Sequence, residues 1–561
     1  MKLKRIIALF ATVAMMATML FGCGKPADSK TTAAPDNKTT EAPAGNPTDG
    51  TTEGSNEAKP VYPLEGNPTV TMWSTISNNV LKTCPTLEDR PYAKELMKRT
   101  GINIDWITPS ASGTAKEEFN IMLTEGTYPH MFSANAADAA RYYKDGVTIV
   151  LNDVIDQYMP NFKAALEKYP EIDKVIRNDD GNYYYIPTWS EVTAMGNSYG
   201  VFARKDLMDK MGVKTPETID EWYNLLVRYK TEVKEKTGKD IYPLAALSST
   251  LLKYGAFLNA YCPDISLAKG YYAEDGKVFY IPATDEYREF LRTMRKWYQE
   301  GLLHPDFAAM SGSVWRGTMS SDDGFVTVGF CGSGLMKIHG LGVEVNPDFE
   351  FTACPTPALS KGEEPRYQSA TPQINTSTAG HVITTNCENV EAAARLLDYY
   401  FTEEGYMLNN YGIEGTSYTM VDGKPVYTDL VLRNPDGLAV NEAKAPYMMN
   451  FEGGRGIQAL EALKGYYSAT PGAADALEIW ASKGKIDHSI CWINQTVEEA
   501  ELISIYHADI EKYMTTCSTQ FILGTMDIET QWEEYITSLE KLKLARVIEL
   551  KQAAMDRYLA K

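Results

Sequence analysis

Acidic side chains are the most abundant chemically active groups of this 561-residue chain, which has 74 Asp and Glu and 54 Lys and Arg. Two carboxylates can together hydrolyse a glycosidic bond, but no pair here is distinguished by its spacing from the many others. The chain has no HExxH or HxH metal pattern and no GxxxxGK[ST] phosphate loop. The sequence therefore predicts no enzyme, no metal site and no cofactor.

A second set of side chains is typical of a carbohydrate-binding site. The flat face of a sugar ring packs on aromatic side chains, and its hydroxyl groups hydrogen-bond to amides and carboxylates. Several aromatic and polar residues are not explained by an apolar helix stripe, and we expect about half of them to line a binding cleft. Each could instead be a core aromatic residue or a loop amide. They are Trp73, Ser74, Trp189, Tyr199, Trp315, Tyr367, Gln373 and Asn375.

Three further candidates lie in glycine-containing segments. Glu414 and Tyr418 belong to the loop GIEGTSY, and Arg455 belongs to EGGRG. Glycine permits positive φ angles and close approach of the backbone to a ligand. The loop could contact a ligand or only brace its lobe. Arg455 could hold a carboxylate by a two-pronged contact or form a local salt bridge.

The first 23 residues have the pattern of an export signal. The basic start MKLKR precedes an uncharged run, Ile6–Phe21, which is too short to span a membrane as a helix. The run ends in LFGC, which resembles the lipobox of bacterial lipoproteins, whose cysteine receives a diacylglycerol. We therefore expect a signal peptide over residues 1–22 and a lipid (palmitate-type) anchor at Cys23, which attaches the protein to the outer face of the cell membrane.

Composition restricts the partners of the protein. Loss of the three basic signal residues changes the formal charge from −20 to −23, so nucleic acid is excluded as a partner. The candidate segments Trp189–Tyr199 and Ser311–Met319 contain Arg316 as their one basic residue. Because so negative a chain repels anions, we expect a neutral sugar ligand. The seven cysteines other than Cys23 form no CxxC pair and are odd in number, which indicates free thiols rather than a disulfide framework.

The rest of the chain divides into a tether and a folded part. Residues 23–60 are a low-complexity segment without large apolar side chains, which is typical of a flexible tether. Residues 61–561 are too many for one core, so we expect two lobes. Strands at 69–73 and 102–107 alternate with helices at 91–100 and 114–124, which predicts an α/β fold with a parallel sheet. An apolar stripe over 287–298 predicts a core helix that includes Trp297.

Several segments, in order, resemble a known family. They are DGVTIVLNDVI (145–155), DDGNYYYIP (179–187), VFARKDLMDKMGV (201–213), TPETIDEW (215–222), YQEGLLHPDF (298–307), YGIEGTSY (411–418) and FILG (521–524). Together they are similar to the extracellular solute-binding lipoproteins of ABC importers, in the subgroup that resembles alginate- and other oligosaccharide-binding proteins. The resemblance covers about residues 61–561.

The resemblance implies a two-lobed periplasmic-binding-protein-like fold (type II) with C-terminal helices. Chain crossings are placed near 189–202 and 366–385, with lobe one over about 61–190 and 325–370 and lobe two over about 200–320 and 380–561. It implies a monomer that captures an oligosaccharide in the cleft between the lobes and delivers it to an ABC permease. The alternatives are a peptide-binding component of an ABC importer and a surface glycoside hydrolase or lyase.

Overall fold

The computed structural model describes residues 61–110, 114–191, 198–368, 373–374, 380–449, 455–485 and 489–561. The predicted signal peptide, Cys23 and the tether lie outside these residues. The chain separates into the units Met1–Asn56 and Glu57–Lys561, and the description below concerns the second unit.

The first sheet has four strands in the order β10-β3-β1-β2. The central strand β1 (Thr69–Trp73) runs parallel to β2 (Asn103–Ile107) and to β3 (Met131–Ala134), whereas β10 (Gly380–Ile383) is antiparallel to β3. Val70 and Met72 of β1 are fully buried, as the apolar alternation of this strand predicts. The predicted parallel sheet is therefore present, with one antiparallel edge strand added from a distant part of the chain.

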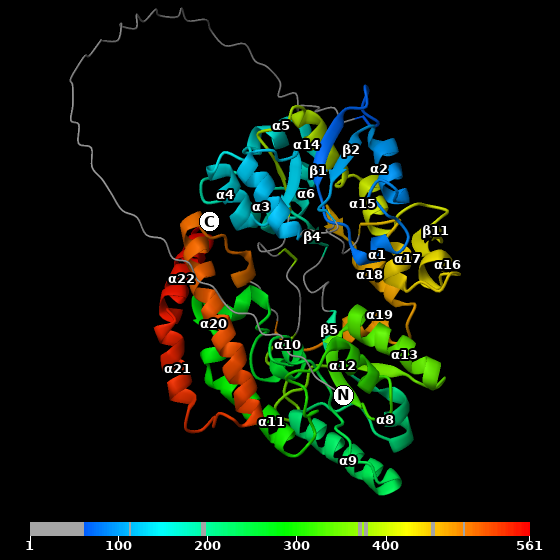
Figure 1. Ribbon diagram of the computed structural model, residues 1–561, viewed down its shortest axis with the longest axis vertical. Coiled ribbons are helices and arrows are strands. Elements are labelled where there is room, and N and C mark those ends of the chain that lie inside the picture. Colours follow the sequence, from blue (N-terminus) through cyan, green and yellow to red (C-terminus); the bar gives the residue numbers. More distant parts are fainter. Residues whose placement is uncertain are drawn as a thin grey trace, which may run out of the picture. The chain divides into compact units, whose positions relative to one another are not determined.

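Helices surround the first sheet (Figure 1). One of them begins with Pro91 and ends where Gly101 takes φ 69°, the left-handed cap expected from the sequence. Helix α1 (Asn78–Leu81) packs apart from the sheet, in a small cluster with Cys84 and Ala445. The helices around the sheet are α2 (Pro91–Thr100), α3 (Ala115–Glu125), α4 (Ala136–Lys144), α5 (Asn152–Tyr158), α6 (Pro160–Lys168), α7 (Pro170–Ile176), α14 (Val390–Tyr399) and α15 (Glu403–Asn410). The first sheet and the helices that pack on it are called the first lobe.

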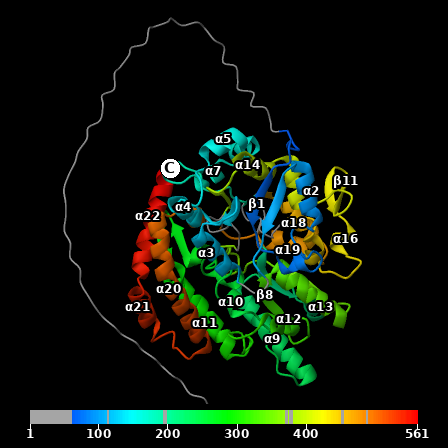
Figure 2. The ribbon, with the colours of Figure 1, turned by 45° about the horizontal axis from the view of Figure 1, so that its top comes forward.

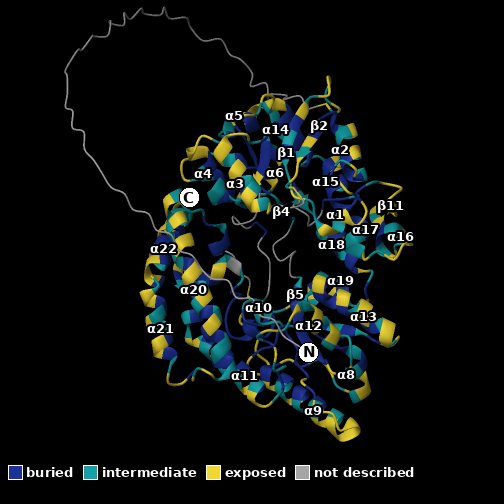
Figure 3. Cartoon of the chain, in the orientation of Figure 1, coloured by how far each residue is buried: buried dark blue, intermediate teal, exposed yellow. Residues whose placement is uncertain are grey.

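The second sheet has β5 (Tyr199–Arg204) at its centre, with β8 (Val326–Phe330) and β9 (Phe351–Cys354) antiparallel on either side. Every residue of β5 is buried, which is shown in dark blue in Figure 3. The apolar stripe on α11 is buried, including Trp297 at 1% exposure, as predicted. The helices here are α8 (Lys205–Met211), α9 (Ile219–Thr237), α10 (Ser248–Leu251), α11 (Asp285–Gln299), α12 (Gly312–Met319) and α13 (Lys337–Val345).

Shorter elements complete this part of the chain. The hairpin β11 (Tyr418–Val421) and β12 (Lys424–Tyr427), with α18 (Leu460–Tyr467) and α19 (Ala473–Trp480), shares one apolar cluster with Phe202 and Phe351 of the second sheet. The others are β4 (Trp189–Ser190), β6 (Tyr271–Glu274), β7 (Lys277–Tyr280), β13 (Ile457–Gln458), α16 (Asp429–Leu432), α17 (Val440–Lys444), the 3-10 turns η1 (Ala256–Ala260), η2 (Leu267–Gly270), η3 (Ile281–Ala283) and η5 (Ser489–Trp492), and the π-helical turn η4 (Cys331–Met336).

The predicted assignment of segments to lobes needs two corrections. Residues 325–370 were expected in lobe one, but β8 and β9 are the neighbours of β5 in the second sheet. Residues from 380 onward were expected in lobe two, but β10 pairs with β3, and α14 and α15 pack in the first core. The reason is that strand partners hundreds of residues apart are selected by packing, which local periodicity does not report.

The C-terminal helices contact both cores. Helix α20 (Val497–Leu523) packs on α11 and on α4, and α22 (Leu544–Ala560) packs on α20 together with α21 (Trp532–Lys541). Figure 2 shows α20, α21 and α22 along one side of the ribbon. These helices, η5 and the second sheet with its helices are called the second lobe. No helix among the described residues is long and apolar enough to cross a membrane.

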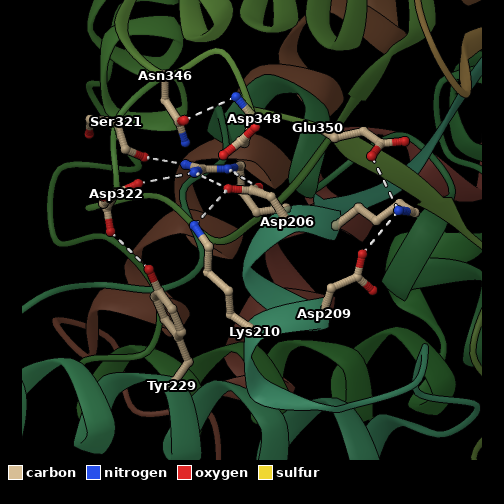
Figure 4. A network of polar contacts seen from close by, with 11 residues as sticks. Asp206, Asp209, Lys210, Tyr229, Ser321, Asp322, Asn346, Asp348 and Glu350 are labelled. Atoms are coloured by element: carbon tan, nitrogen blue, oxygen red, sulfur yellow. Dashed lines mark hydrogen bonds and ion pairs between the residues drawn. The ribbon is translucent and has the colours of Figure 1, made fainter.

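A buried arginine stabilises the outer end of the second sheet (Figure 4). Arg204, the last residue of β5, is 0% exposed. It donates two hydrogen bonds to the Asp206 carboxylate, both of 2.8 Å, one of 2.9 Å to the Ser321 carbonyl and one of 3.0 Å to Asp322. Because both charges are paired, this network joins β5 and α8 to the turn before β8 rather than forming a ligand site.

The cysteines agree with the prediction of free thiols. All seven cysteines of the described chain are free, and six of them are buried.

Candidate functional site

The carboxyl ends of β1 and β3 form one edge of the first sheet. Trp73 ends β1, and Ala134 ends β3 opposite Gly380, where β10 begins. Open α/β sheets bind ligands at this kind of edge. Trp73 is half-buried, and its ring packs on Phe119 with the centroids 5.7 Å apart. Part of this indole therefore remains available beside Ser74, as the sequence predicts.

A second aromatic group lies at the inner end of the second sheet. Tyr199 begins β5 directly opposite Phe330, the last residue of β8. The rings of Tyr199, Tyr254 and Phe330 form a triangle with all three centroid distances 5.0 Å. Tyr199 is 2% exposed, whereas Tyr254 and Phe330 are half-buried. The accessible aromatic surface here thus belongs to two residues that sequence analysis missed.

Both edges border the chain crossings. Glu191, beside β4 in the first lobe, is eight positions before Tyr199 of β5 in the chain, so these points are at most about 30 Å apart. The other edge includes Gly380, which follows the crossing that starts after Gln368. The predicted crossings near 189–202 and 366–385 do join the two cores, since Trp189 and Ile374 pack in the first core and Tyr199 and Tyr367 in the second.

Three of the predicted aromatic residues are core residues. Trp189 is 2% exposed and stacks on Phe401 at 5.2 Å. Trp315 is 5% exposed, and its Nε1 donates to Thr327 Oγ1 at 2.8 Å. Tyr367 packs edge-on against a neighbouring tyrosine and is 6% exposed. These three rings offer almost no surface to a ligand, because each fills its own core.

Gln373 belongs to a polar node at the crossings. Its Nε2 donates to the backbone carbonyl of Glu191 at 3.3 Å, and the backbone carbonyl of Gln373 accepts from Ser190 N at 2.9 Å. The Glu191 carboxylate accepts from the Tyr406 hydroxyl at 2.5 Å and from Leu460 N at 3.2 Å. Burial, and then the hydrogen bond to Glu191, raise the pKa of Tyr406. Glu191 thus ties several crossing segments together, and Asn375 lies outside the described residues.

The loop with Glu414 and Tyr418 is braced from within. Gly412 has φ 88°, and a side chain there would lie 2.4 Å from Ser417 Oγ. That hydroxyl donates to the Tyr411 carbonyl at 2.7 Å and accepts from the backbone of the same turn. Tyr418 is 5% exposed and packs on Tyr411, whereas Glu414 is exposed. The contacts of Tyr418 favour the bracing alternative.

Arg455 is buried within the first lobe. Its Nε donates to His381 Nε2 at 2.9 Å, and its Nη2 lies 2.9 Å from the sulfur of Met72. The guanidinium also lies over the Tyr400 ring at 5.6 Å. Burial, and then the charge of Arg455, hold the pKa of His381 well below its usual value, so this imidazole is neutral. Arg455 therefore braces β10 and β1, and its partner is a histidine rather than the predicted carboxylate.

One cavity, of about 610 Å³, lies between α4 of the first lobe and the C-terminal helices of the second. It was not predicted, because its walls come from segments more than 400 residues apart. No group of three or more His, Cys, Asp or Glu side chains that could hold a metal ion occurs in the part of the chain that the structure describes. The cavity lining comprises Asn135–Asp138, Arg141, Ser266, Ala268, Lys269, Ile490, Cys491, Ile493–Gln495, Val497, Ala500, Glu501, Ile503–Ile505 and Lys551.

Comparison with known proteins gives a consistent result. A family model described as bacterial extracellular solute-binding protein matches residues 85–407. The chain is 24% identical over 489 residues to FusA, the fructooligosaccharide ABC transporter substrate-binding protein of Streptococcus pneumoniae, with 83% of this chain and 87% of FusA covered. It is 25% identical to the lipoprotein LipO of Bacillus subtilis over 64% of this chain and 70% of LipO.

Solved structures agree on the fold. The alginate-binding protein AlgQ2 without calcium ion superposes with a TM-score of 0.66 at 22% identity, over 88% of this chain and 99% of that chain. This likeness confirms the predicted α/β, two-lobed periplasmic-binding-protein-like fold (type II).

Proposed function

Because this chain belongs to the family of bacterial extracellular solute-binding proteins, we propose that it captures an oligosaccharide between its two lobes and delivers it to the permease of an ABC importer. FusA is the fructooligosaccharide substrate-binding protein of an ABC transporter, which supports this class of ligand. Family members of this kind bind substrates rather than convert them, and we propose that this chain has no catalytic activity of its own.

The observation that carries the proposal is the half-buried aromatic surface at the two sheet edges. Trp73 and Phe119 supply it on the first lobe, and Tyr254 and Phe330 on the second. Flat, partly solvated rings suit the apolar face of a sugar, which also needs nearby hydrogen-bonding groups. A ligand that contacts both edges would bind better when the lobes are close, so it would shift the protein toward a closed form.

We extend the proposal to the location of the protein. Residues 1–22 would be removed as a signal peptide, and acyl chains on Cys23 would hold the protein at the outer face of the cell membrane. The tether over 23–60 would then let a monomeric binding unit reach its permease. LipO, a relative that is itself called a lipoprotein, supports this arrangement.

A thermal-shift screen of the purified protein tests the function. A ligand at one hundred times its Kd stabilises a protein by about 2.7 kcal/mol, which appears as a higher Tm. We expect fructooligosaccharides or other glycans to raise the Tm and to be recovered intact by chromatography. A shift with peptides and with no glycan would favour a peptide-binding component. Shortened glycans would favour a hydrolase or lyase.

A further inference from the structure

The cavity between α4 and the C-terminal helices has the size of a ligand site. Its volume of about 610 Å³ falls within the range of roughly 300–1,000 Å³ usual for such sites. Helix α4 belongs to the first core, whereas Ile490, Cys491 and Ile503 of the opposite wall belong to the second. Figure 1 shows α4 beside the orange and red C-terminal helices. A molecule bound here would therefore contact both lobes.

Lys551 of α22 lines this cavity with a buried charge. The residue is 5% exposed, and its Nζ lies 4.9 Å from the centre of the Tyr271 ring. Among the described residues, no carboxylate or other hydrogen-bond acceptor contacts this ammonium group. Lysine is rarely this buried without a partner, because a desolvated charge is costly. Burial first, and the charge of Lys269 second, lower the pKa of Lys551 to about 8.

The surroundings of Lys551 add positive potential. Lys269 is exposed at the cavity and forms no ion pair with a described residue. The nine-residue helix α4 begins at the cavity. Its first two residues are Ala136 and Ala137, and their N–H groups have no partners within the helix, as at any helix N-terminus. An anion at this position would thus be attracted by two ammonium groups and a helix N-terminus.

The carboxylates of the lining do not pair with the two lysines. The acidic residues of the lining are Asp138, which is paired with Arg141 at 2.8 Å, and Glu501, which is exposed. Asn494 donates to the Val175 carbonyl at 2.5 Å, while its buried Oδ1 has no partner among the described residues. Because that atom is covered by protein, it offers no surface to a molecule in the cavity.

We propose that this cavity binds the carboxylate-bearing unit of a sugar acid, with the carboxylate paired to Lys551. The inference rests on the proposed function and refines it. It amends the neutral-sugar prediction, which considered segments that contain almost no basic residues. Neutral rings would pack on the aromatic sheet edges, and an acidic unit would occupy the cavity.

Calorimetric titration of the purified protein tests the site with three probes: galacturonate, its neutral counterpart galactose, and acetate. The variants are Lys551→Met, which keeps an apolar stem, Lys269→Met, whose exposed side chain is not needed for folding, and the control Lys541→Met, an exposed lysine on α21. We expect galacturonate to bind at least tenfold more tightly than galactose or acetate. Lys551→Met should weaken galacturonate binding about tenfold to a hundredfold, Lys269→Met should weaken it severalfold, and Lys541→Met should leave it unchanged.

Several outcomes would overturn the inference. Equal binding of galacturonate and galactose would exclude the proposed ion pair. An unchanged preference for galacturonate over galactose in both Lys551→Met and Lys269→Met would exclude it as well. If acetate binds as tightly as galacturonate, the site recognises simple anions and not a sugar acid. If oligosaccharides raise the Tm but galacturonate does not bind, the inference fails and the proposed function remains. If galacturonate binds through Lys551 and no oligosaccharide raises the Tm, the sugar-acid site is supported and the proposed function fails.

Discussion

Trp73 and Trp189 are chemically identical side chains with different surroundings. Trp73 is half-buried at the carboxyl edge of the first sheet, whereas Trp189 is 2% exposed and enclosed by Phe162, Tyr169 and Phe401. A ring can pack on a sugar only through surface that the protein leaves open. The indole of Trp73 can therefore act in binding, while that of Trp189 acts in stability.

We predict that Trp73→Ala weakens oligosaccharide binding about tenfold, which is about 1.4 kcal/mol, because a sugar face loses its packing partner. Calorimetric titration with the glycan that gives the largest thermal shift measures this change. The matched variant Trp189→Ala should instead lower the free energy of unfolding by about 3–5 kcal/mol. Unchanged affinity in a well-folded Trp73→Ala protein would contradict the assignment of this edge.

The buried carboxyl group of Asp398 introduces a pH dependence of stability. Asp398 is 0% exposed and accepts hydrogen bonds from Phe162 N at 2.9 Å and Asn161 Nδ2 at 2.7 Å. Burial outweighs these bonds and raises its pKa from 3.8 to about 6. The native state therefore holds a proton that the unfolded chain has already lost between pH 4 and 6. In this window the contribution of Asp398 to stability falls as the pH rises.

Asp398→Asn cannot ionise, so its stability relative to the original protein should increase from pH 4 to pH 7, by at most about 3 kcal/mol. Denaturant unfolding at both pH values measures this difference. Asp105→Asn, an exposed site on β2, makes the same chemical change as a control. A constant difference between Asp398→Asn and the original protein across this range would show that Asp398 is ionised in the native state.

At the scale of elements, α22 is joined to the first lobe by ion pairs. Arg557 Nε lies 2.7 Å from Asp179 Oδ2, and Lys561 Nζ lies 3.0 Å from Asp179 Oδ1. Arg557 also pairs with Glu499 of α20 at 2.5 Å. Asp179 is in the first lobe, so any motion that separates the lobes on this side must break these contacts. About a third of each side chain is exposed, so each pair contributes at most about 1 kcal/mol.

We predict that Arg557→Met shifts the protein toward more open forms and weakens ligand binding by a few fold. The effect should be largest at low salt, because at high salt screening already weakens the Arg557 ion pairs of the original protein. Small-angle scattering without ligand and calorimetry at two salt concentrations measure both changes. Arg546→Met is the control, since Arg546 pairs with Glu549 of its own helix at 3.0 Å. Equal behaviour of the two variants would exclude a role for this contact in lobe separation.

At the scale of the whole molecule, the N-terminal segment is expected to determine location and not folding. The cores consist of residues from Val70 onward, and the proposed anchor at Cys23 precedes them by more than 40 residues. We predict that Cys23→Ala leaves the Tm and glycan affinity unchanged but moves the protein from the membrane fraction to the soluble fraction. Fractionation followed by immunoblotting measures this, and retention in washed membranes would indicate another means of attachment.

Local features could be read from the sequence because they depend on neighbouring residues. The strand at Thr69–Trp73, the helix of Pro91–Thr100 that ends at Gly101, and the buried stripe on α11 follow from apolar periodicity and capping residues. The order of family-like segments likewise indicated the two-lobed fold and the family. Each strand, helix or single segment spans fewer than twenty residues, a distance over which the backbone geometry itself relates the side chains.

Only the tertiary structure decided which segments meet. The pairing of β10 with β3 and of β8 with β5, the burial of Trp189, Trp315 and Arg455, and the cavity with Asn494 and Lys551 all depend on contacts between distant segments. Lys551 has the sequence surroundings of an ordinary surface lysine. It becomes a buried charge because α22 packs on α20 and β7, and no local pattern records that packing.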